Sequence, residues 1–259
     1  MGNTINSTTV GMIVFACTFG GVLLGMRLQN TLPGHHLNAE SKDTVKVGIG
    51  LVATMTALIL GLITASAKSS YDAANSAVKR TAVEILTIDR LLARYGSETD
   101  EIRKGLQRAI GERIDMIWSQ GSSQITNLDP VGSGTVREDE LLSLAIRTLK
   151  PRDDSQRVLK SRALDMAETL LQERWLVFAG AETPVPVPFL VILLFWLTIT
   201  FATFGMFAPR NATVLTALSV CALSVSLAVF LVLEMDAPFD GLLKVSADPL
   251  RYAYAHLNQ

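Results

Sequence analysis

The sequence predicts an all-α membrane protein in which four transmembrane helices flank a helical cytosolic insert. Hydrophobic residues make up 49% of the 259 residues, but they are unevenly distributed. Four stretches of membrane length carry almost no charge, and the segment 68–186 between the second and the third is densely charged. The stretches lie at about 9–27, 47–67, 187–207 and 213–233. Since a helix needs roughly 20 apolar residues to cross the hydrocarbon core, each stretch qualifies as a span.

The spans divide the chain into a first transmembrane hairpin (1–67), a helical cytosolic domain (68–186), a second hairpin (187–233) and a cytosolic tail (234–259). Four spans place both termini and the insert on one side of the membrane. All but four of the 23 Lys and Arg residues lie on that side, so the positive-inside rule predicts that it is cytosolic. The four exceptions are Arg27, Lys42, Lys46 and Arg210.

The first span, 9–27, is predicted to be retained, because no basic residue precedes it as one would in a cleaved secretory leader. Cleavage of a leader is the alternative. The span contains the small-residue pattern Gly21-x-x-x-Gly25, which is typical of close helix packing in membranes. The following connection, 28–46, contains Pro33-Gly34 and is predicted to be an exposed loop.

The second span carries a face of small and polar residues at 4-3-4-3-4 spacing, which places them on one side of a helix. These residues are Gly50, Thr54, Ala57, Gly61, Thr64 and Lys68. From periodicity alone, we interpret this face as packing against Gly21 and Gly25 of the first span. No Pro or Gly follows until Gly96, so the sequence predicts one helix that leaves the membrane and continues into the cytosol.

The rest of the insert also shows helical periodicity. Ser97 and Asp100 form a capping pattern before a helix that extends to about Ile117. A Gly/Ser-rich loop, 119–135, precedes two further helices at about 136–149 and 152–179. Their apolar faces must pack against each other or against neighbouring subunits. Acidic and basic residues are nearly balanced, which argues against nucleic acid as a partner.

The third span follows the stiff segment "TPVPVP" (183–188), and only "APRN" (208–211) separates it from the fourth. We therefore expect the third and fourth spans to form a tight antiparallel hairpin.

No residue cluster indicates catalysis. Cys17 and Cys221 lie within apolar spans, and the three histidines have no zinc-site spacing. Phosphate-binding glycine loops and Gly-x-Ser-x-Gly elbows are absent from the sequence. We expect neither an enzyme nor a bound organic cofactor.

Three motifs in order, "GLVATMTALILGLITASAKSSYD", "FWLTITFATFGMFAPRNATV" and "LVLEMDAPFDGLLKVS", resemble a bacterial bestrophin-like branch of the bestrophin superfamily. The resemblance implies a homo-oligomeric, pentameric ion channel in the bacterial plasma membrane, with the second helix of each subunit lining the pore. Many bestrophins pass chloride or bicarbonate, and a bacterial relative prefers cations. The family's hydrophobic neck would fall at Ala57, Gly61 and Ala65, where bestrophins usually carry bulky Ile or Phe. This chain departs from that pattern.

The resemblance changes the interpretation of the small face, because five copies of it would surround a water-filled path for small ions. Thr54, Ala57, Gly61, Ala65 and Lys68 are then predicted to face the axis, and a ring of Lys68 ammonium groups would favour anions. The alternative for Lys68 is a side chain that extends to the membrane interface. The alternative function is a non-conducting scaffold or sensor whose cytosolic helices bind a partner protein. The expected partners are inorganic ions, membrane lipid and further copies of the chain.

The fourth span ends in three acids, Glu234, Asp236 and Asp240, around the turn residues Pro238 and Gly241. We favour a structural clasp, in which these acids accept hydrogen bonds from Lys and Arg of the long second helix. In animal bestrophins, an acidic run after the fourth span binds calcium, and three carboxylates on a turning backbone suit that ion. A calcium site is therefore one alternative, and a solvated turn is the other.

Overall fold

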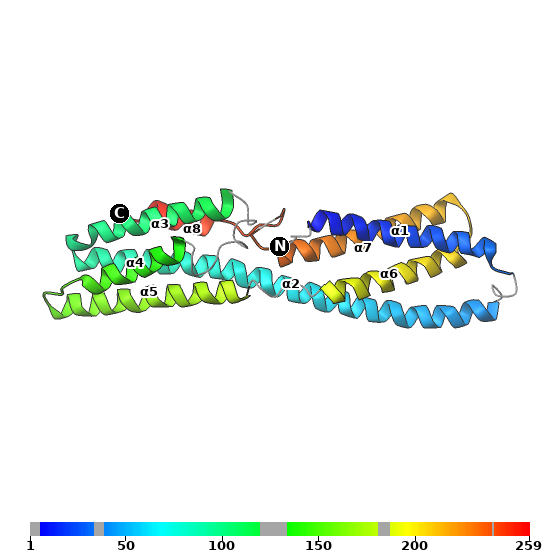
Figure 1. The fold of residues 1–259 in the computed structure, drawn as a ribbon, viewed down its shortest axis with the longest axis horizontal. Helices are drawn as coiled ribbons and strands as arrows, with labels where there is room; N and C mark the ends of the chain where they lie inside the picture. The colour runs from blue at the N-terminus through cyan, green and yellow to red at the C-terminus, as the bar shows by residue number, and fades with distance from the viewer. Residues whose placement is uncertain (1–5, 34–38, 120–133, 181–186, 240) are drawn as a thin grey trace. The chain divides into compact units, whose positions relative to one another are not determined.

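The computed structural model describes residues 6–33, 39–119, 134–180, 187–239 and 241–259, and within these ranges the regular structure is helical (Figure 1). Four helices are long and apolar enough to cross a membrane. They are α1 (Ser7–Thr31), α2 (Ala39–Tyr95), α6 (Val187–Phe207) and α7 (Ala212–Asp236). The predicted fold class is confirmed.

The chain forms two compact units. The first contains α1, α6, α7 and the N-terminal part of α2, to residue 70. The second contains the rest of α2, the helices α3 (Asp100–Ser119), α4 (Gly134–Thr148), α5 (Asp154–Gly180) and α8 (Asp248–His256), and the segment from 237 onward. The tail 234–259, predicted as a separate part of the chain, thus contributes from residue 237 onward to the same unit as the insert.

In the first unit, α1 packs along both α6 and α7, most closely along α6 (Figure 1). Glycines allow this approach. A Cβ atom added at Gly25 would lie 1.9 Å from the Ala202 carbonyl oxygen, and one added at Gly205 would lie 2.2 Å from that of Val22. Helices α1 and α6 therefore touch through their backbones, as small-residue packing in membranes predicts.

The predicted short link between α6 and α7 is present, because α6 ends at Phe207 and α7 begins at Ala212, and the two helices run in opposite directions (Figure 1). Helix α1 packs on both of them. The short link 208–211 constrains only where the two helices meet. Arg210 in that link donates to the Met26 carbonyl of α1, and Asn211 caps α7 by accepting from the Val214 amide at 2.8 Å.

Helix α2 is continuous over 57 residues, which corresponds to about 85 Å at 1.5 Å per residue. It ends where predicted, at Gly96, whose φ of +136° favours a residue without a side chain. The chain then enters α3 through a single 3-10 turn, Ser97–Thr99, rather than directly from a Ser97 cap. The Thr99 hydroxyl donates to the Leu92 carbonyl at 2.6 Å and so ties this turn to the end of α2.

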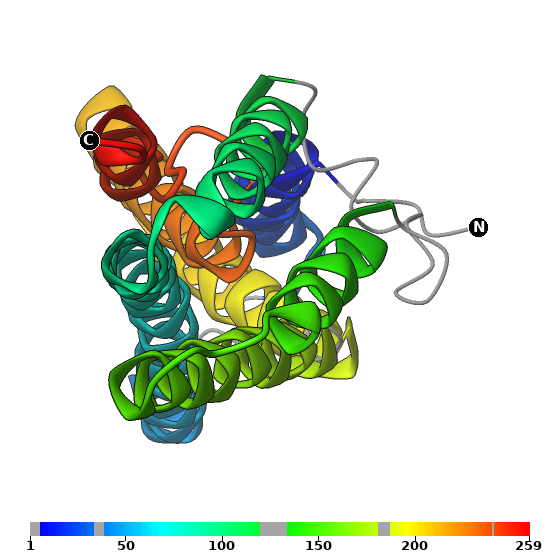
Figure 2. The same cartoon turned by 90° about the vertical axis from the view of Figure 1, so that its left-hand side faces the viewer.

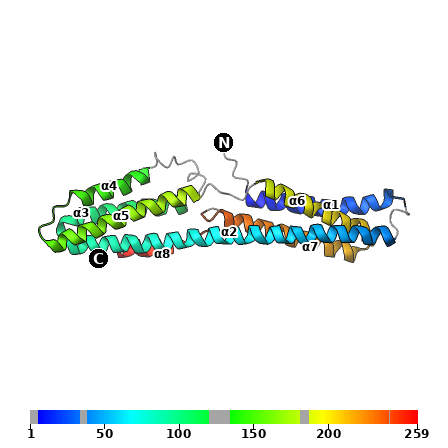
Figure 3. The ribbon, with the colours of Figure 1, turned by 90° about the horizontal axis from the view of Figure 1, so that it is seen from below.

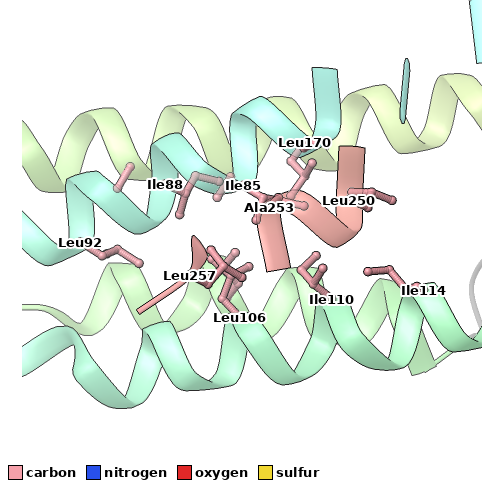
Figure 4. Close-up of a cluster of buried hydrophobic side chains, with 14 of the residues drawn as sticks. Ile85, Ile88, Leu92, Leu106, Ile110, Ile114, Leu170, Leu250, Ala253 and Leu257 are labelled. Carbon is pink, nitrogen blue, oxygen red and sulfur yellow. The ribbon is translucent and has the colours of Figure 1, made fainter. Parts of the chain in front are cut away.

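The second unit has one apolar core, to which α2, α3, α4, α5 and α8 all contribute (Figure 2). Their side chains point toward one another between the helices (Figure 4). The labelled members are Ile85, Ile88, Leu92, Leu106, Ile110, Ile114, Leu170, Leu250, Ala253 and Leu257. Most of the insert's apolar faces are therefore covered within a single chain.

One ion pair is buried beside this core. Asp89 of α2 is fully buried and accepts two hydrogen bonds from Arg103 of α3, at 2.8 Å to Nε and 3.1 Å to Nη2. The hydrogen bond to Asp89 raises the pKa of Arg103 above its usual value. The two charges, fourteen residues apart, fix α3 against α2.

The sequence analysis did not predict helix α8. Its buried residues Leu250, Ala253 and Leu257 lie on one face, and Pro249 stands in its first turn. It packs on α3, where the Tyr254 ring would lie 3.1 Å from a Cβ atom added at Gly111.

Candidate functional site

The small face of α2 is exposed within the single chain. Its six members, and Ala65 beside them, are all exposed: Gly50, Thr54, Ala57, Gly61, Thr64, Ala65 and Lys68. A Cβ atom added at Gly50 or Gly61 would meet nothing within 4 Å. In the membrane part of α2, only 11% of the most apolar window is buried, against 17% to 33% in the other three spans.

The two threonines of this face use their hydroxyl hydrogens within the helix. The Thr54 hydroxyl donates to the Gly50 carbonyl at 2.8 Å, and the Thr64 hydroxyl donates to the Leu60 carbonyl at 2.7 Å. The hydroxyl oxygens therefore remain as acceptors on the exposed surface. Such oxygens can replace water around a cation, and they offer no hydrogen-bond donor to an anion.

The other side of α2 is covered. Thr56, Ile63 and Ala67 are buried, and the last two pack with Val232 of α7. In Figure 3, α2 passes in front of α7, and their contact at Val232 lies in the last two turns of α7. Helix α2 is thus anchored by one side, which leaves the small face directed away from its contact with α7.

The interpretation that the small face packs on Gly21 and Gly25 is wrong. Both glycines lie against α6, where added Cβ atoms would meet the carbonyl oxygens of Thr198 and Ala202. The helical period places small residues on one face of α1 and on one face of α2, but it does not indicate which helices pack together.

An apolar strip runs beside the small face. Its large side chains are also exposed: Leu51, Met55, Leu58 and Leu62. Their 4-3-4 spacing along the sequence places these residues on one side of the helix. In a membrane, such a strip contacts either lipid or a neighbouring helix.

The acidic segment begins in the last turn of α7. Glu234 is buried, with 3% of its surface exposed, and Asp236 is half-buried. Asp240 lies outside the described residues. Within the described ranges, no group of three His, Cys, Asp or Glu side chains has metal-binding proximity.

The turn after these acids is tied into the second unit. The Val245 amide donates to the Pro238 carbonyl at 2.8 Å, and Gly241 has a φ of +78°. Phe239 packs edge-on against Trp118 of α3 at a centroid distance of 6.1 Å, and the Trp118 indole donates to the Val245 carbonyl at 2.8 Å. Sequence reasoning missed Trp118 because it lies 127 residues before its acceptor.

Solved structures resemble this fold over nearly its whole length. A crystal structure of a point variant of a bacterial bestrophin homologue from Klebsiella pneumoniae matches with a TM-score of 0.63 and 17% identity, over 92% of this chain and 96% of that one. A second crystal structure of a Klebsiella pneumoniae homologue, phased with zinc, matches with a TM-score of 0.62 and 17% identity, over 90% and 94%. A variant described only as a membrane protein reaches 0.66 with 15% identity, over 93% and 96%.

No protein with curated annotation matches the sequence. The Bestrophin-like domain, in contrast, matches residues 16–250, which include most of the first span, the other three spans, the insert and most of the tail. This chain therefore belongs to the bestrophin-like family.

Proposed function

We propose that this chain is one subunit of a homo-pentameric ion channel in the bacterial plasma membrane, with both termini in the cytosol. The small face of α2 lines the pore, and small anions such as chloride are preferred. Family membership supports a bestrophin-like channel in general. The pentamer, the pore lining and the anion preference go beyond family membership, and we propose them for this chain.

The exposure of the small face in a single chain carries this proposal. Hydrophobic side chains dominate surfaces that contact lipid, whereas this face presents glycines, alanines, threonine oxygens and a lysine. A ring of subunits would enclose it around an axis, where such groups contact water and ions. The neighbouring strip of Leu51, Leu58 and Leu62 supplies an apolar surface for the adjacent subunit.

The preference for anions depends on Lys68. It is the only charged residue between 47 and 68, and it lies where α2 leaves the first unit. Since the threonine hydroxyls present acceptors, which suit cations, the ammonium ring is the group on this face that attracts anions.

The test is conduction by the purified protein in a planar bilayer with asymmetric salt, together with its stoichiometry by native mass spectrometry. We expect discrete currents from a pentamer. Thr54→Trp should abolish the currents by filling the axis, and Leu227→Trp, at an exposed apolar position of α7 that the proposal places in neither the pore nor the strip, should leave most of them.

A monomer or dimer without currents would support the scaffold alternative instead. Equal block by both tryptophans would place the pore elsewhere.

A further inference from the structure

A cavity of about 650 Å³ lies in the first unit, where α1 ends and α7 begins. This volume is within the range of ligand-binding pockets. The cavity has two chemically different parts. Arg27 and Arg210 line one part, with Asn30 and Asn211 near them in sequence, and Gly20, Leu23, Leu24 and Leu215 line the other.

Two arginines line the polar part of the cavity. The Nη2 of Arg210 donates to the Met26 carbonyl, which holds this side chain at the end of α1 and leaves most of its five N–H donors available. In the described part of the chain, neither Arg27 nor Arg210 is paired with a carboxylate. Two such arginines on one cavity complement an anion, and their planar forks suit phosphate oxygens.

The apolar part lies one to two turns farther into the spans. Leu23 and Leu24 belong to the apolar run of α1 and are exposed, and Leu215 belongs to the first turn of α7. Gly20 widens the cavity, because a Cβ atom added there would meet no atom within 4 Å. Cationic groups at the end of two spans, above an apolar groove, match a phospholipid with its phosphate at the surface and an acyl chain in the membrane.

We propose that this cavity binds an anionic phospholipid, with the phosphate held by Arg27 and Arg210 and an acyl chain lying over Gly20, Leu24 and Leu215. The site is separate from the proposed pore face on α2, and the inference does not depend on conduction.

The test uses the delipidated full-length protein in mild detergent. It is titrated separately with dioleoyl phosphatidylglycerol, dioleoyl phosphatidylcholine and inorganic phosphate, and bound lipid is counted by native mass spectrometry. Since two guanidinium groups attract a net negative headgroup more strongly than a zwitterionic one, we expect phosphatidylglycerol to bind at least about tenfold more tightly than phosphatidylcholine. Inorganic phosphate should neither bind measurably nor displace the lipid.

Two variants separate the parts of the site. The double variant Arg27→Gln/Arg210→Gln should bind phosphatidylglycerol no better than phosphatidylcholine. The matched control Lys42→Gln/Lys46→Gln removes the same charge from α2, outside the cavity, and should bind as the wild type does. Gly20→Leu keeps both arginines but fills the groove, and should weaken both lipids.

Equal binding of the two lipids by the wild type would overturn the preference for an anionic lipid, and equal losses in the two double variants would overturn the role of Arg27 and Arg210. Displacement of the lipid by phosphate alone, or unchanged lipid binding in Gly20→Leu, would overturn the acyl-chain groove.

Discussion

At the scale of single residues, Lys68 is proposed to decide the sign of the ions admitted. Lys68→Glu replaces a ring of ammonium groups with a ring of carboxylates, so we expect reversal potentials in asymmetric salt to shift toward cation preference. Arg108→Glu makes the same charge change on an exposed position of α3 and should leave the reversal potential unchanged. An equal shift in both variants, or none in Lys68→Glu, would remove Lys68 from the selectivity filter.

A second residue-scale prediction concerns the buried pair of Asp89 and Arg103. Asp89→Ala leaves the Arg103 guanidinium, whose side chain is only 11% exposed, without its carboxylate. Breaking such a pair costs about 3–5 kcal/mol, so denaturant unfolding should show a loss of that order. Asp154→Ala breaks the exposed pair with Arg157 and should change stability by less than about 1 kcal/mol. Similar losses in the two variants would contradict the buried pair's role.

The sequence allowed the small face to be predicted but not the contacts around it. Spacing alone places Gly50, Gly61 and Lys68 on one side of a helix, because the α-helical period is fixed. Nothing local links Asp89 to Arg103 or Trp118 to Val245, because neither pair belongs to one periodic pattern. The hydrogen bonds of Thr54 and Thr64 within α2 also required coordinates, since a threonine in a helix can adopt more than one rotamer.

At the scale of helices, close packing of α1 on α6 leads to a prediction about Gly25. Gly25→Ala would place a methyl group 1.9 Å from the Ala202 carbonyl oxygen, so the two backbones must separate. Overpacking of this kind costs about 1–3 kcal/mol, and the melting temperature of the purified protein should fall by several degrees. Gly48→Ala, in open space on α2, should leave it unchanged or slightly higher. An unchanged melting temperature in Gly25→Ala would mean that α1 and α6 do not pack through their backbones.

Helix α8 gives the second prediction at this scale. Ala253 is fully buried in the core of the second unit, whereas Ala255 on the same helix is exposed. Ala253→Asp should bury a carboxylate among apolar side chains and detach α8, which would raise amide hydrogen exchange in α3. Ala255→Asp should leave exchange in α3 as in the wild type. If amide hydrogen exchange in α3 stays as slow in Ala253→Asp as in Ala255→Asp, α8 is not part of the core.

Long helices were predictable and short or paired features were not. The 57 residues of α2 contain enough periods to show a continuous pattern and end at a glycine. The nine residues of α8 contain little more than two turns, too few to show a helical period clearly. The short link 208–211 predicts only that α6 and α7 follow each other, and the glycines that bring α1 against α6 were not assigned to that contact by sequence spacing.

At the scale of the whole molecule, Glu234 and Asp236 test whether the acidic segment is a clasp or a calcium site. We propose the clasp, so Glu234→Ala and Asp236→Ala should weaken the oligomer in native mass spectrometry with or without calcium. The loss should be larger for Glu234, because it is more deeply buried.

The control for this prediction is the effect of calcium on the wild type. If calcium raises the melting temperature of the wild type by several degrees, and both variants lose that increase, the acids are ligands and the clasp is wrong.

The fold class of the whole chain was predictable, because the charge distribution separates membrane spans from the insert without any knowledge of packing. The number of subunits could not be predicted from the sequence. A stoichiometry is set by the angle at which neighbouring faces meet, and the spacing of residues along one helix does not contain that angle.

The position of α8 in the core has a consequence for synthesis of the protein. Leu250 and Leu257 pack with α2 and α3, which the ribosome completes more than a hundred residues earlier. At about 5–20 residues per second, the delay is on the order of ten seconds. During that time α6 and α7 must enter the bilayer while the emerging core of the second unit lacks the side chains of α8. Translation that stops before residue 248 would leave this core open, so a nascent chain bearing α2 to α5 should be a substrate for chaperones until α8 is released.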